Sequence, residues 1–453
     1  MKFFLNSIYC AFFGLFFGII SSSSALANNA DGQIIYDVKP GDTLIAIANN
    51  YMVKSVSYHN LQKLNAVQNP RHLPINKKII IPRAWLKYQR VDAQIISLRG
   101  NVVRISQGTA NNLAVGGILR EGDIIRTNNA SYTTLMLPDR TKLSIPSNSE
   151  IRISLLRQYN LGKYVDIDFD IIKGGAKTKV TPLKSKQDRY RIRTPRSVSA
   201  VRGTEFQMRA EDADASIVEV LEGGVSVDLN AVKNSDADME SSAENNADIA
   251  QNILQSGFGL KQFADGRKIT ENLLAAPNLN EASFLQKNEK LQFSAIPPSQ
   301  WKGLRAEISA DSGFTDIIYD GYFDKEEIIT PSLEDGNYFI RLSAISDNKI
   351  EGIPGIYGFK RRLHSLSASG GKDAFGYKFK WAILGAGKMT QRLQIFKDSK
   401  NNIPFVDEAG LTSNEITISD LPKGEYFWRV GSNQFLDGEF STSWTEFEKI
   451  VVN

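Results

Sequence analysis

Apolar residues follow a helical spacing near the start of the chain and an alternating spacing beyond it. Within residues 34–82, Leu44, Ile47 and Ala48 recur at i, i+3 and i+4, which places them on one helix face. Strand-like runs flank this helix and a second one. After Arg90, short alternating runs are separated by Gly, Pro and Asn, which predicts strands and turns. We therefore expect a multidomain, mainly β protein with a small βααβ module in front.

The first 27 residues predict export. Lys2 precedes the apolar run Phe3–Ile20, and Ala25-Leu26-Ala27 follows it, a pattern typical of a secretory signal peptide. The alternative is an uncleaved anchor, for which the run is short, since a span needs about 20 residues. Cleavage after Ala27 removes Cys10, the one cysteine, and leaves 453 − 27 = 426 residues.

Composition narrows the chemistry that the chain can perform. The charge of 54 − 50 = +4 is too small to indicate a nucleic-acid binder. One cysteine and three scattered histidines exclude a Cys-rich zinc site and a disulfide framework. The segment Gly385–Thr390 departs at two positions from a phosphate-binding loop, and no nucleophile–base motif stands out. We expect no catalytic residues, no metal and no cofactor, although carboxylates from distant loops could still form a pair.

Residues 34–83 carry a denser pattern than the apolar spacing alone. Its positions are Tyr36-x-Val38-x-x-Gly41-Asp42-Thr43-Leu44, Ile47-Ala48, Leu61-x-x-Leu64-Asn65 and Ile79-x-Ile81-Pro82. This pattern resembles a LysM domain, a module that binds peptidoglycan and chitin. Asn76 stands where the family usually has glycine, but asparagine tolerates the left-handed backbone of a tight turn. Asp42 is expected to cap the first helix.

The resemblance implies a carbohydrate site on this module. In the family, N-acetylglucosamine sugars lie in a shallow groove between the loop after the first strand and the loop before the last. The corresponding glycan-binding residues here are Gly41, Asp42, Thr43, Leu44, Leu73, Pro74 and Ile75. Each also has a purely structural explanation, because Gly41 and Asp42 can form a turn and a cap while Leu44 packs in the core.

After a basic linker at Arg83–Arg90, residues 93–277 are expected to form an all-β domain. This region contains the short motifs Arg120-Glu121-Gly122-Asp123, Leu137-Pro138-Asp139, Thr194-Pro195, Val201–Phe206 and Glu219–Val227. Together they resemble the FecR-type periplasmic domain from Ala93 to about Leu229. The eponymous family member relays ferric-citrate status across the envelope through a transmembrane helix and a cytoplasmic segment, neither of which is recognised here. An acidic, disordered loop is predicted at 232–250.

Three arginines in the FecR-like region suggest a second site. Arg189, Arg191 and Arg193 alternate with Tyr190 and Ile192, which puts the guanidinium groups on one face of a strand. In an exported protein this face would suit an anionic envelope polymer. The alternative is an ordinary solvated sheet face.

The C-terminal part of the chain contains a repeat at an offset of 88 residues. Leu333-x-x-Gly336-x-Tyr338-Phe339-x-Arg341 matches Leu421-x-x-Gly424-x-Tyr426-Phe427-x-Arg429, and Glu327-Ile328 matches Glu415-Ile416. The repeats, 280–365 and 371–453, look like fibronectin type III or related immunoglobulin-like sandwiches in which the tyrosine ties a turn. Their cores are expected to rely on aromatic residues that include Trp301, Trp381, Trp428 and Trp444.

The parts together predict a non-enzymatic, periplasmic protein of the cell envelope. Its LysM module would hold it on peptidoglycan or another N-acetylglucosamine glycan, and its β domains would bind an envelope protein. No nucleic-acid partner is expected, nor a transmembrane segment after signal cleavage. One alternative is an envelope sensor that uses the FecR-like domain. A glycan-processing enzyme is a weaker alternative, since no catalytic constellation stands out.

Overall fold

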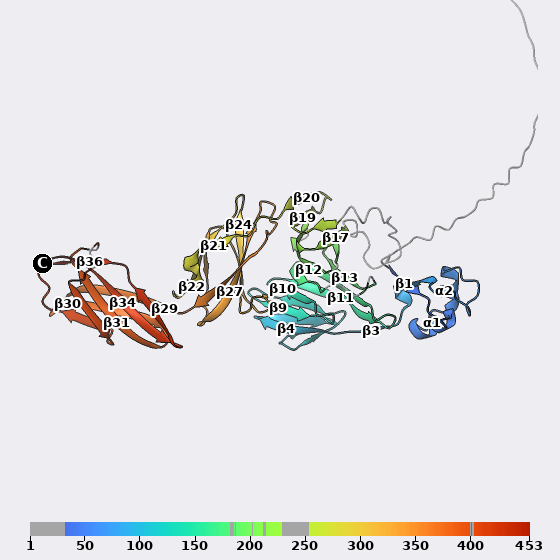
Figure 1. Ribbon diagram of the computed structural model, residues 1–453, viewed down its shortest axis with the longest axis horizontal. Coiled ribbons are helices and arrows are strands. Elements are labelled where there is room, and N and C mark those ends of the chain that lie inside the picture. The colour runs from blue at the N-terminus through green and yellow to red at the C-terminus, as the bar shows by residue number, and fades with distance from the viewer. Residues whose placement is uncertain are drawn as a thin grey trace, which may run out of the picture.

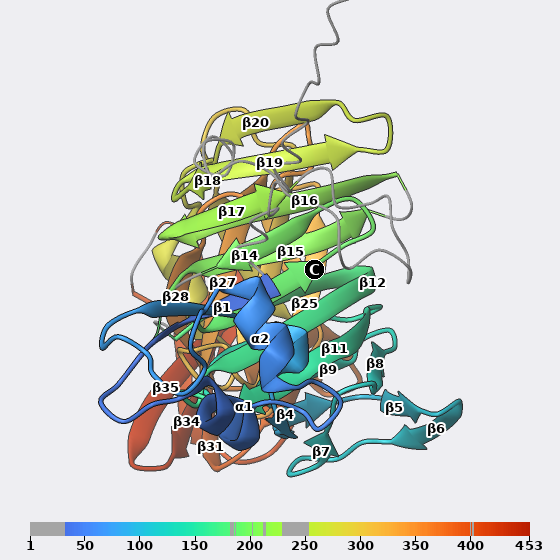
Figure 2. The same cartoon turned by 90° about the vertical axis from the view of Figure 1, so that its right-hand side faces the viewer.

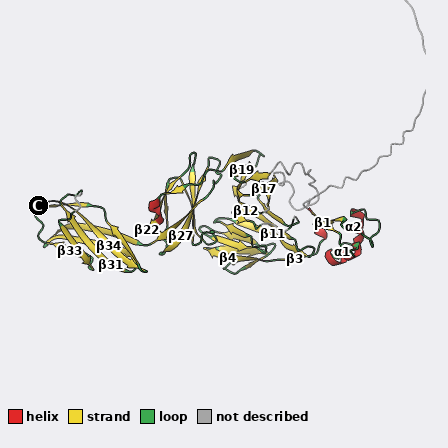
Figure 3. Ribbon diagram, viewed as in Figure 1, coloured by secondary structure: helices red, strands yellow, loops and turns green. Residues whose placement is uncertain are grey.

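The computed structural model describes residues 32–181, 185, 187–201, 203–211, 214–228, 253–398, 400 and 403–453. The predicted signal peptide and the acidic loop at 232–250 lie outside the described residues. The protein is mainly β, and its parts follow one another in a row from the small module to the C-terminal sandwich (Figure 1). Both α-helices of the described residues belong to that module, while the red segment near β22 in Figure 3 is the 3-10 turn η5 (Glu281–Phe284).

The N-terminal module has the predicted strand, helix, helix, strand order. Its elements are β1 (Gln33–Asp37), α1 (Leu44–Tyr51), α2 (Tyr58–Leu64) and β2 (Lys78–Pro82). β1 and β2 pair antiparallel. α1 buries Leu44, Ile47 and Ala48, so the expected face is the one that forms the core.

The cap of α1 differs from the expectation. Thr43, not Asp42, accepts the free backbone N–H of Ala46 in the first turn, at 3.0 Å. Asp42 stands one residue too early, and its carboxylate instead accepts the N–H of Lys39 at 2.8 Å. The N-cap residue is the one whose side chain can accept a backbone N–H of the first helical turn, and here that residue is Thr43.

The segment expected to be a basic linker is packed structure. It forms the 3-10 turn η2 (Arg83–Trp85) and the strand β3 (Tyr88–Arg90), which pairs with β11 (Glu150–Tyr159) of the next domain. Tyr159, the last residue of β11, and Leu161, in the turn that follows, are each 3% exposed and belong to the core of the N-terminal module. The module therefore shares its core with the domain that follows.

That domain consists of two antiparallel-rich sheets that share the long strand β12 (Val165–Lys179). The first sheet runs β6 (Thr109–Asn112), β5 (Val102–Ser106), β8 (Ile124–Thr127), β11, β12, β13 (Arg189–Arg193), β14 (Val198–Val201), β17 (Gly224–Asp228), β18 (Ile253–Gln255). The second runs β7 (Ile118–Leu119), β4 (Ala93–Arg99), β9 (Tyr132–Met136), β10 (Lys142–Ile145), β12, β15 (Glu205–Glu211), β16 (Ala215–Glu222), β19 (Phe258–Phe263), β20 (Lys268–Asn272). Figure 2 shows the strands stacked from β7 at the bottom to β20 at the top.

One core lies between the two sheets. It takes alternate residues from both, among them Ile95 and Leu135 of the second sheet and Ile151 and Ile192 of the first. After the undescribed stretch, β18 pairs with β17 in the first sheet and β19 pairs with β16 in the second. β13 is the exception to the antiparallel pattern, because it runs parallel to β12.

Two β-sandwiches complete the chain. The first has the sheets β21 (Asn278–Leu279), β23 (Leu291–Ile296), β26 (Glu327–Thr330) and β22 (Leu285–Gln286), β28 (Gly355–Arg361), β27 (Gly336–Ile345), β24 (Gly303–Ser309), β25 (Ile317–Phe323), with the 3-10 turn η5 (Glu281–Phe284). The second has β29 (His364–Asp373), β30 (Gly376–Gly385), β33 (Glu415–Ile418) and β32 (Val406–Leu411), β31 (Lys388–Phe396), β34 (Gly424–Leu436), β35 (Glu439–Trp444), with β36 (Glu448–Val452) on β34.

The tyrosine of each repeat ties a turn, as expected. The Tyr338 hydroxyl donates to the carbonyl of Glu334 at 3.1 Å, and the Tyr426 hydroxyl donates to that of Pro422 at 2.9 Å. Both bonds reach back four residues, so the tie recurs at the repeat offset. Of the expected core tryptophans, Trp381 and Trp428 are buried and Trp301 is half-buried. Trp444 is not a core residue: it lies 36% exposed on β35 and stacks under Arg429.

Candidate functional site

The two loops expected to bind glycan lie together at one end of the β1–β2 pair. The backbone N–H of Leu44 donates to the carbonyl of Pro70 at 2.9 Å, and that of Asn76 donates to Val38 at 2.9 Å. Asn76 has a φ of 63°, the left-handed conformation expected where the family has glycine. Gly41 has a φ of 86°, and a Cβ there would meet no atom within 4 Å, so the space over this turn is open.

A partly buried hydrogen bond fixes the first of these loops. The Tyr36 hydroxyl donates to Asp42 Oδ2 at 2.7 Å. Burial, followed by the bond and charge of Asp42, raises the pKa of Tyr36 above its ordinary value. Asp42 Oδ2 accepts both this bond and the one from the backbone N–H of Lys39, which gives the carboxylate a structural role in the loop.

The seven sequence-predicted glycan residues divide into buried, half-buried and exposed groups. Leu44 and Leu73 are 0% and 7% exposed, so their side chains belong to the core. Asp42 and Thr43 are half-buried and engaged in the turn and the helix cap. Gly41, Pro74 and Ile75 are exposed, and Ile75, at 60%, presents an apolar side chain to solvent. An open backbone turn on one loop and an exposed apolar side chain on the loop bonded to it are features that can contact an acetamido sugar.

The three arginines of β13 form a ladder of ion pairs with β12. The parallel register places Arg189 beside Asp166 and Arg191 beside Asp168. Arg189 Nη2 lies 2.6 Å from Asp166 Oδ2, while Arg191 and Arg193 Nη2 lie 2.5 and 2.9 Å from Asp168 Oδ2. The two aspartate side chains are at most 2% exposed.

This ladder corrects the expectation of an outward, solvated face. Arg189 and Arg191 are 13% and 10% exposed at the side chain, and only Arg193, at 36%, reaches solvent. Burial acts against the charge of Asp166, but the bond and charge of Arg189 lower the pKa of that carboxyl below its ordinary value. Tyr190 and Ile192 do face the core, so the predicted alternation is present.

A second charged cluster, which the sequence analysis missed, joins the β domain to the first sandwich. Glu351 of the sandwich, 0% exposed, lies 3.0 Å from Arg305 Nη1 and 3.2 Å from Arg209 Nη1 of β15. Its backbone N–H donates to Glu219 Oε1 at 3.0 Å. Glu307 Oε2 of the sandwich forms an ion pair with Lys177 Nζ of β12, at 2.7 Å. No motif in the sequence marks this cluster, because each contact that crosses the junction joins residues more than a hundred positions apart.

Comparison with known families assigns two of these parts. A family model described as "LysM domain" matches residues 36–82, and one described as "FecR protein" matches residues 123–226. The chain carries a LysM domain and a FecR domain. The FecR match is shorter than the region expected from sequence, which ran from Ala93 to about Leu229. Domains of these two types bind or regulate.

Solved structures resemble parts of the chain only distantly. A putative anti-sigma factor from Parabacteroides distasonis is 18% identical, with a TM-score of 0.24 over 33% of this chain and 59% of that one. Chicken CNTN1 FN1–FN3 domains are 9% identical, TM-score 0.21, covering 56% and 94%. Fibronectin(III)-like modules of Clostridium thermocellum CbhA are 11% identical, TM-score 0.19, covering 39% and 93%. At these scores the likenesses carry no argument about function. The comparison with curated proteins gave no match.

Two further findings concern the described part of the chain. None of its helices has the length and apolar character needed to cross a membrane. Nor do its His, Cys, Asp and Glu side chains gather in threes or more where they could hold a metal ion.

Proposed function

We propose that this protein is a peptidoglycan-binding component of the bacterial cell envelope, held on the wall by its LysM domain. The FecR domain and the two sandwiches then display surfaces for an envelope partner. The LysM match over residues 36–82 carries the proposal. It is supported by the open turn at Gly41 and the exposed Ile75, which lie on the two loops where the family binds its sugars.

The bond pattern of the loops favours a neutral, carbohydrate ligand. Asp42 Oδ2 is engaged within its own loop, which leaves the half-exposed carboxylate's Oδ1 and the backbone groups around Gly41 as polar partners for sugar hydroxyl and amide groups. Ile75 offers apolar surface that can pack on a sugar ring or an acetamido methyl. We expect such binding to depend weakly on salt, because hydrogen bonds between neutral groups are little affected by screening.

The test is cosedimentation of the full exported chain with purified, insoluble peptidoglycan. Ile75→Glu should weaken pelleting by about fivefold, since losing part of one apolar side-chain contact costs about 1 kcal/mol. Ile35→Glu is the matched control, because Ile35 is also an exposed isoleucine of the LysM domain, at 46%, but lies on β1. Equal pelleting by both variants and the parent would mean that the protein is held on the wall elsewhere or not at all.

An envelope-sensing role is the second candidate, and the FecR match favours it. It differs in its prediction, because a sensor needs a link to the membrane. Retention of the segment Phe3–Ile20, measured by N-terminal sequencing of the protein recovered from cells, would support sensing. A start near Asn28 would support the free wall-bound form.

A further inference from the structure

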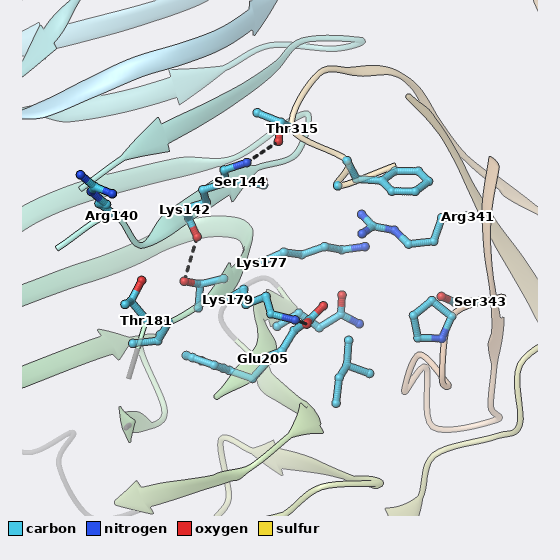
Figure 4. Close-up of a pocket in the computed structure, with 18 of the residues that line it drawn as sticks. Arg140, Lys142, Ser144, Lys177, Lys179, Thr181, Glu205, Thr315, Arg341 and Ser343 are labelled. Atoms are coloured by element: carbon cyan, nitrogen blue, oxygen red, sulfur yellow. Dashed lines mark hydrogen bonds and ion pairs between the residues drawn. The ribbon is translucent and has the colours of Figure 1, made fainter. Parts of the chain in front are cut away.

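A cavity of about 460 Å³ lies between the FecR domain and the first sandwich. Strands β10, β12 and β15 supply one side, while the loop at 313–315, β27 and the loop at 352–354 supply the other (Figure 4). Its volume is within the range of about 300–1,000 Å³ that small-molecule sites occupy. Neither domain alone encloses it, so it exists only in the docked arrangement.

The charged groups around the cavity are mostly cationic. The cations that line it are Arg140, Lys142, Lys177, Lys179 and Arg341, and the one lining carboxylate is Glu205. Figure 4 shows Lys177 and Arg341 pointing toward each other from opposite sides. The two share Glu307, whose Oε2 is 2.7 Å from Lys177 Nζ and 2.7 Å from Arg341 Nε.

Two of the cations have charge to offer a ligand. Lys179 is paired with Glu205 at 2.7 Å, but no ion pair between described residues involves Arg140 or Lys142. The Lys142 ammonium donates to Thr315 Oγ1 at 2.9 Å, a neutral partner supplied by the other domain. A lysine held at a domain junction by a hydroxyl alone lacks the negative charge that would balance it.

Apolar side chains form the remaining walls. Phe206 and Phe314 are 1% and 2% exposed, and Val180, Leu221 and Pro354 also line the cavity. The Phe314 ring lies 4.2 Å below the Arg341 guanidinium. An inorganic anion would leave these apolar walls unfilled, whereas an acid with an apolar body would cover them.

We propose that this cavity binds a small organic acid that joins a carboxylate to an apolar group. The carboxylate is placed near Lys142 and Arg140, and the apolar part lies against Phe206 and Phe314. Lysine and arginine accept either carboxylate or phosphate as a partner. The apolar walls are the reason for assigning an organic acid rather than free phosphate.

The experiment is calorimetric titration of the full exported chain with N-acetylated leucine and phenylalanine as probes. Their C-terminal amides have nearly the same shape without the charge, and inorganic phosphate provides the charge without the apolar body. We expect saturable binding of at least one acid with a Kd near or below about 1 mM, and at least tenfold weaker binding of its amide and of phosphate. Absence of saturable binding by both acids, or equal binding of acid and amide, would overturn the proposal. Equal binding of phosphate would overturn the assignment to organic acids.

Variants locate the site. Lys142→Met and Arg140→Gln should each weaken the acid at least fivefold, and both residues are exposed enough for the fold to tolerate the change. Lys173→Met is the matched control, because Lys173 is an exposed lysine of β12 that does not line the cavity. If all three variants bind like the parent, the acid is bound elsewhere and the proposal fails. This test is independent of glycan binding, since peptidoglycan is absent from it.

Discussion

At the scale of single residues, the aspartates of β12 matter more than the arginines that attract attention in the sequence. Asp168 serves two guanidinium groups and is 2% exposed. Removing one partner of a buried pair leaves uncompensated charge in the interior, which costs about 3–5 kcal/mol. The geometry thus turns a predicted binding face into part of the internal structure of the FecR domain.

We expect Asp168→Ala to lower the free energy of unfolding by about 3 kcal/mol or more, for that reason. Glu150→Ala is the comparison, because Glu150 pairs with the half-exposed Arg126 at 2.7 Å on the same sheet. An exposed pair of that kind contributes about 0–1 kcal/mol. Urea unfolding followed by fluorescence measures both. Similar losses in the two variants would show that the ladder contributes no more than a surface pair.

Lys177 gives a prediction about pH. Burial lowers the pKa of the Lys177 ammonium, and the nearby charges of Arg305 and Arg341 lower it further. The charges of Glu307 and Glu351 raise it only in part, so the pKa falls from 10.5 to about 8. Between these values the unfolded chain binds more protons at this group, so the contribution of Lys177 to stability rises with pH. Relative to Lys177→Met, the parent should gain stability from pH 8 to pH 10. A constant difference across this window, measured by urea unfolding, would contradict the shifted pKa.

At the scale of elements, features set by a local sequence pattern could be predicted, whereas the pairing of strands could not. The 88-residue repeat makes β26 and β27 of the first sandwich equivalent to β33 and β34 of the second. Each tyrosine tie joins residues only four positions apart, so it too follows from the local sequence. The row of arginines shows the limit. The alternation of β13 correctly puts Tyr190 in the core. Nothing within β13, however, indicates that this strand pairs in parallel with β12, whose Asp166 and Asp168 lie more than twenty residues earlier in the chain.

Trp444 and the segment after Pro82 were mispredicted for related physical reasons. Trp444 lies on β35, an edge strand that pairs only with β34 among the described strands. Its ring is covered by the guanidinium of Arg429 rather than by a second sheet. The basic residues after Pro82 look like a solvated linker, yet the Arg83 guanidinium donates to the carbonyl of Gln187 at 2.7 Å. Composition alone does not show whether a long cationic side chain lies across a neighbouring domain.

The tyrosine ties give a paired prediction. Tyr338→Phe and Tyr426→Phe should each lower the stability of their own sandwich by about 1 kcal/mol, because each removes one hydroxyl bond and leaves the ring in place. Tyr319→Phe is the control, since no hydrogen bond of its hydroxyl is found among the described residues of the first sandwich. Calorimetric unfolding of the three variants decides. A loss for Tyr319→Phe as large as the others would mean that the effect belongs to the ring environment and not to the tie.

At the scale of the whole molecule, the junctions differ in strength. The FecR domain meets the first sandwich through the buried cluster around Glu351 and the apolar contact of Ile217 with Ile350. The two sandwiches meet through more exposed pairs, such as Arg362 with Asp437 at 3.1 Å. We therefore infer that the FecR domain and first sandwich unfold together while the second sandwich unfolds on its own.

Glu351→Ala should uncouple the unfolding of the FecR domain from that of the first sandwich. It removes the acceptor of Arg305 and Arg209 at the buried junction, and the two domains should then melt in distinct calorimetric transitions. Asp347→Ala is the control, because Asp347 lies on the same loop, 75% exposed, 3.5 Å from Lys302. A single transition in both variants would show that other contacts are enough to couple the domains.

The shared core of the LysM and FecR domains has a mechanical consequence. Because Tyr159 and Leu161 complete the LysM core and β3 pairs with β11, the two domains have no free swivel between them. A rod clamped at one end points in one direction, whereas a rod on a flexible tether sweeps a hemisphere. If the LysM domain lies flat on a glycan strand, the strand's direction sets the heading of the FecR domain and the sandwich docked on it.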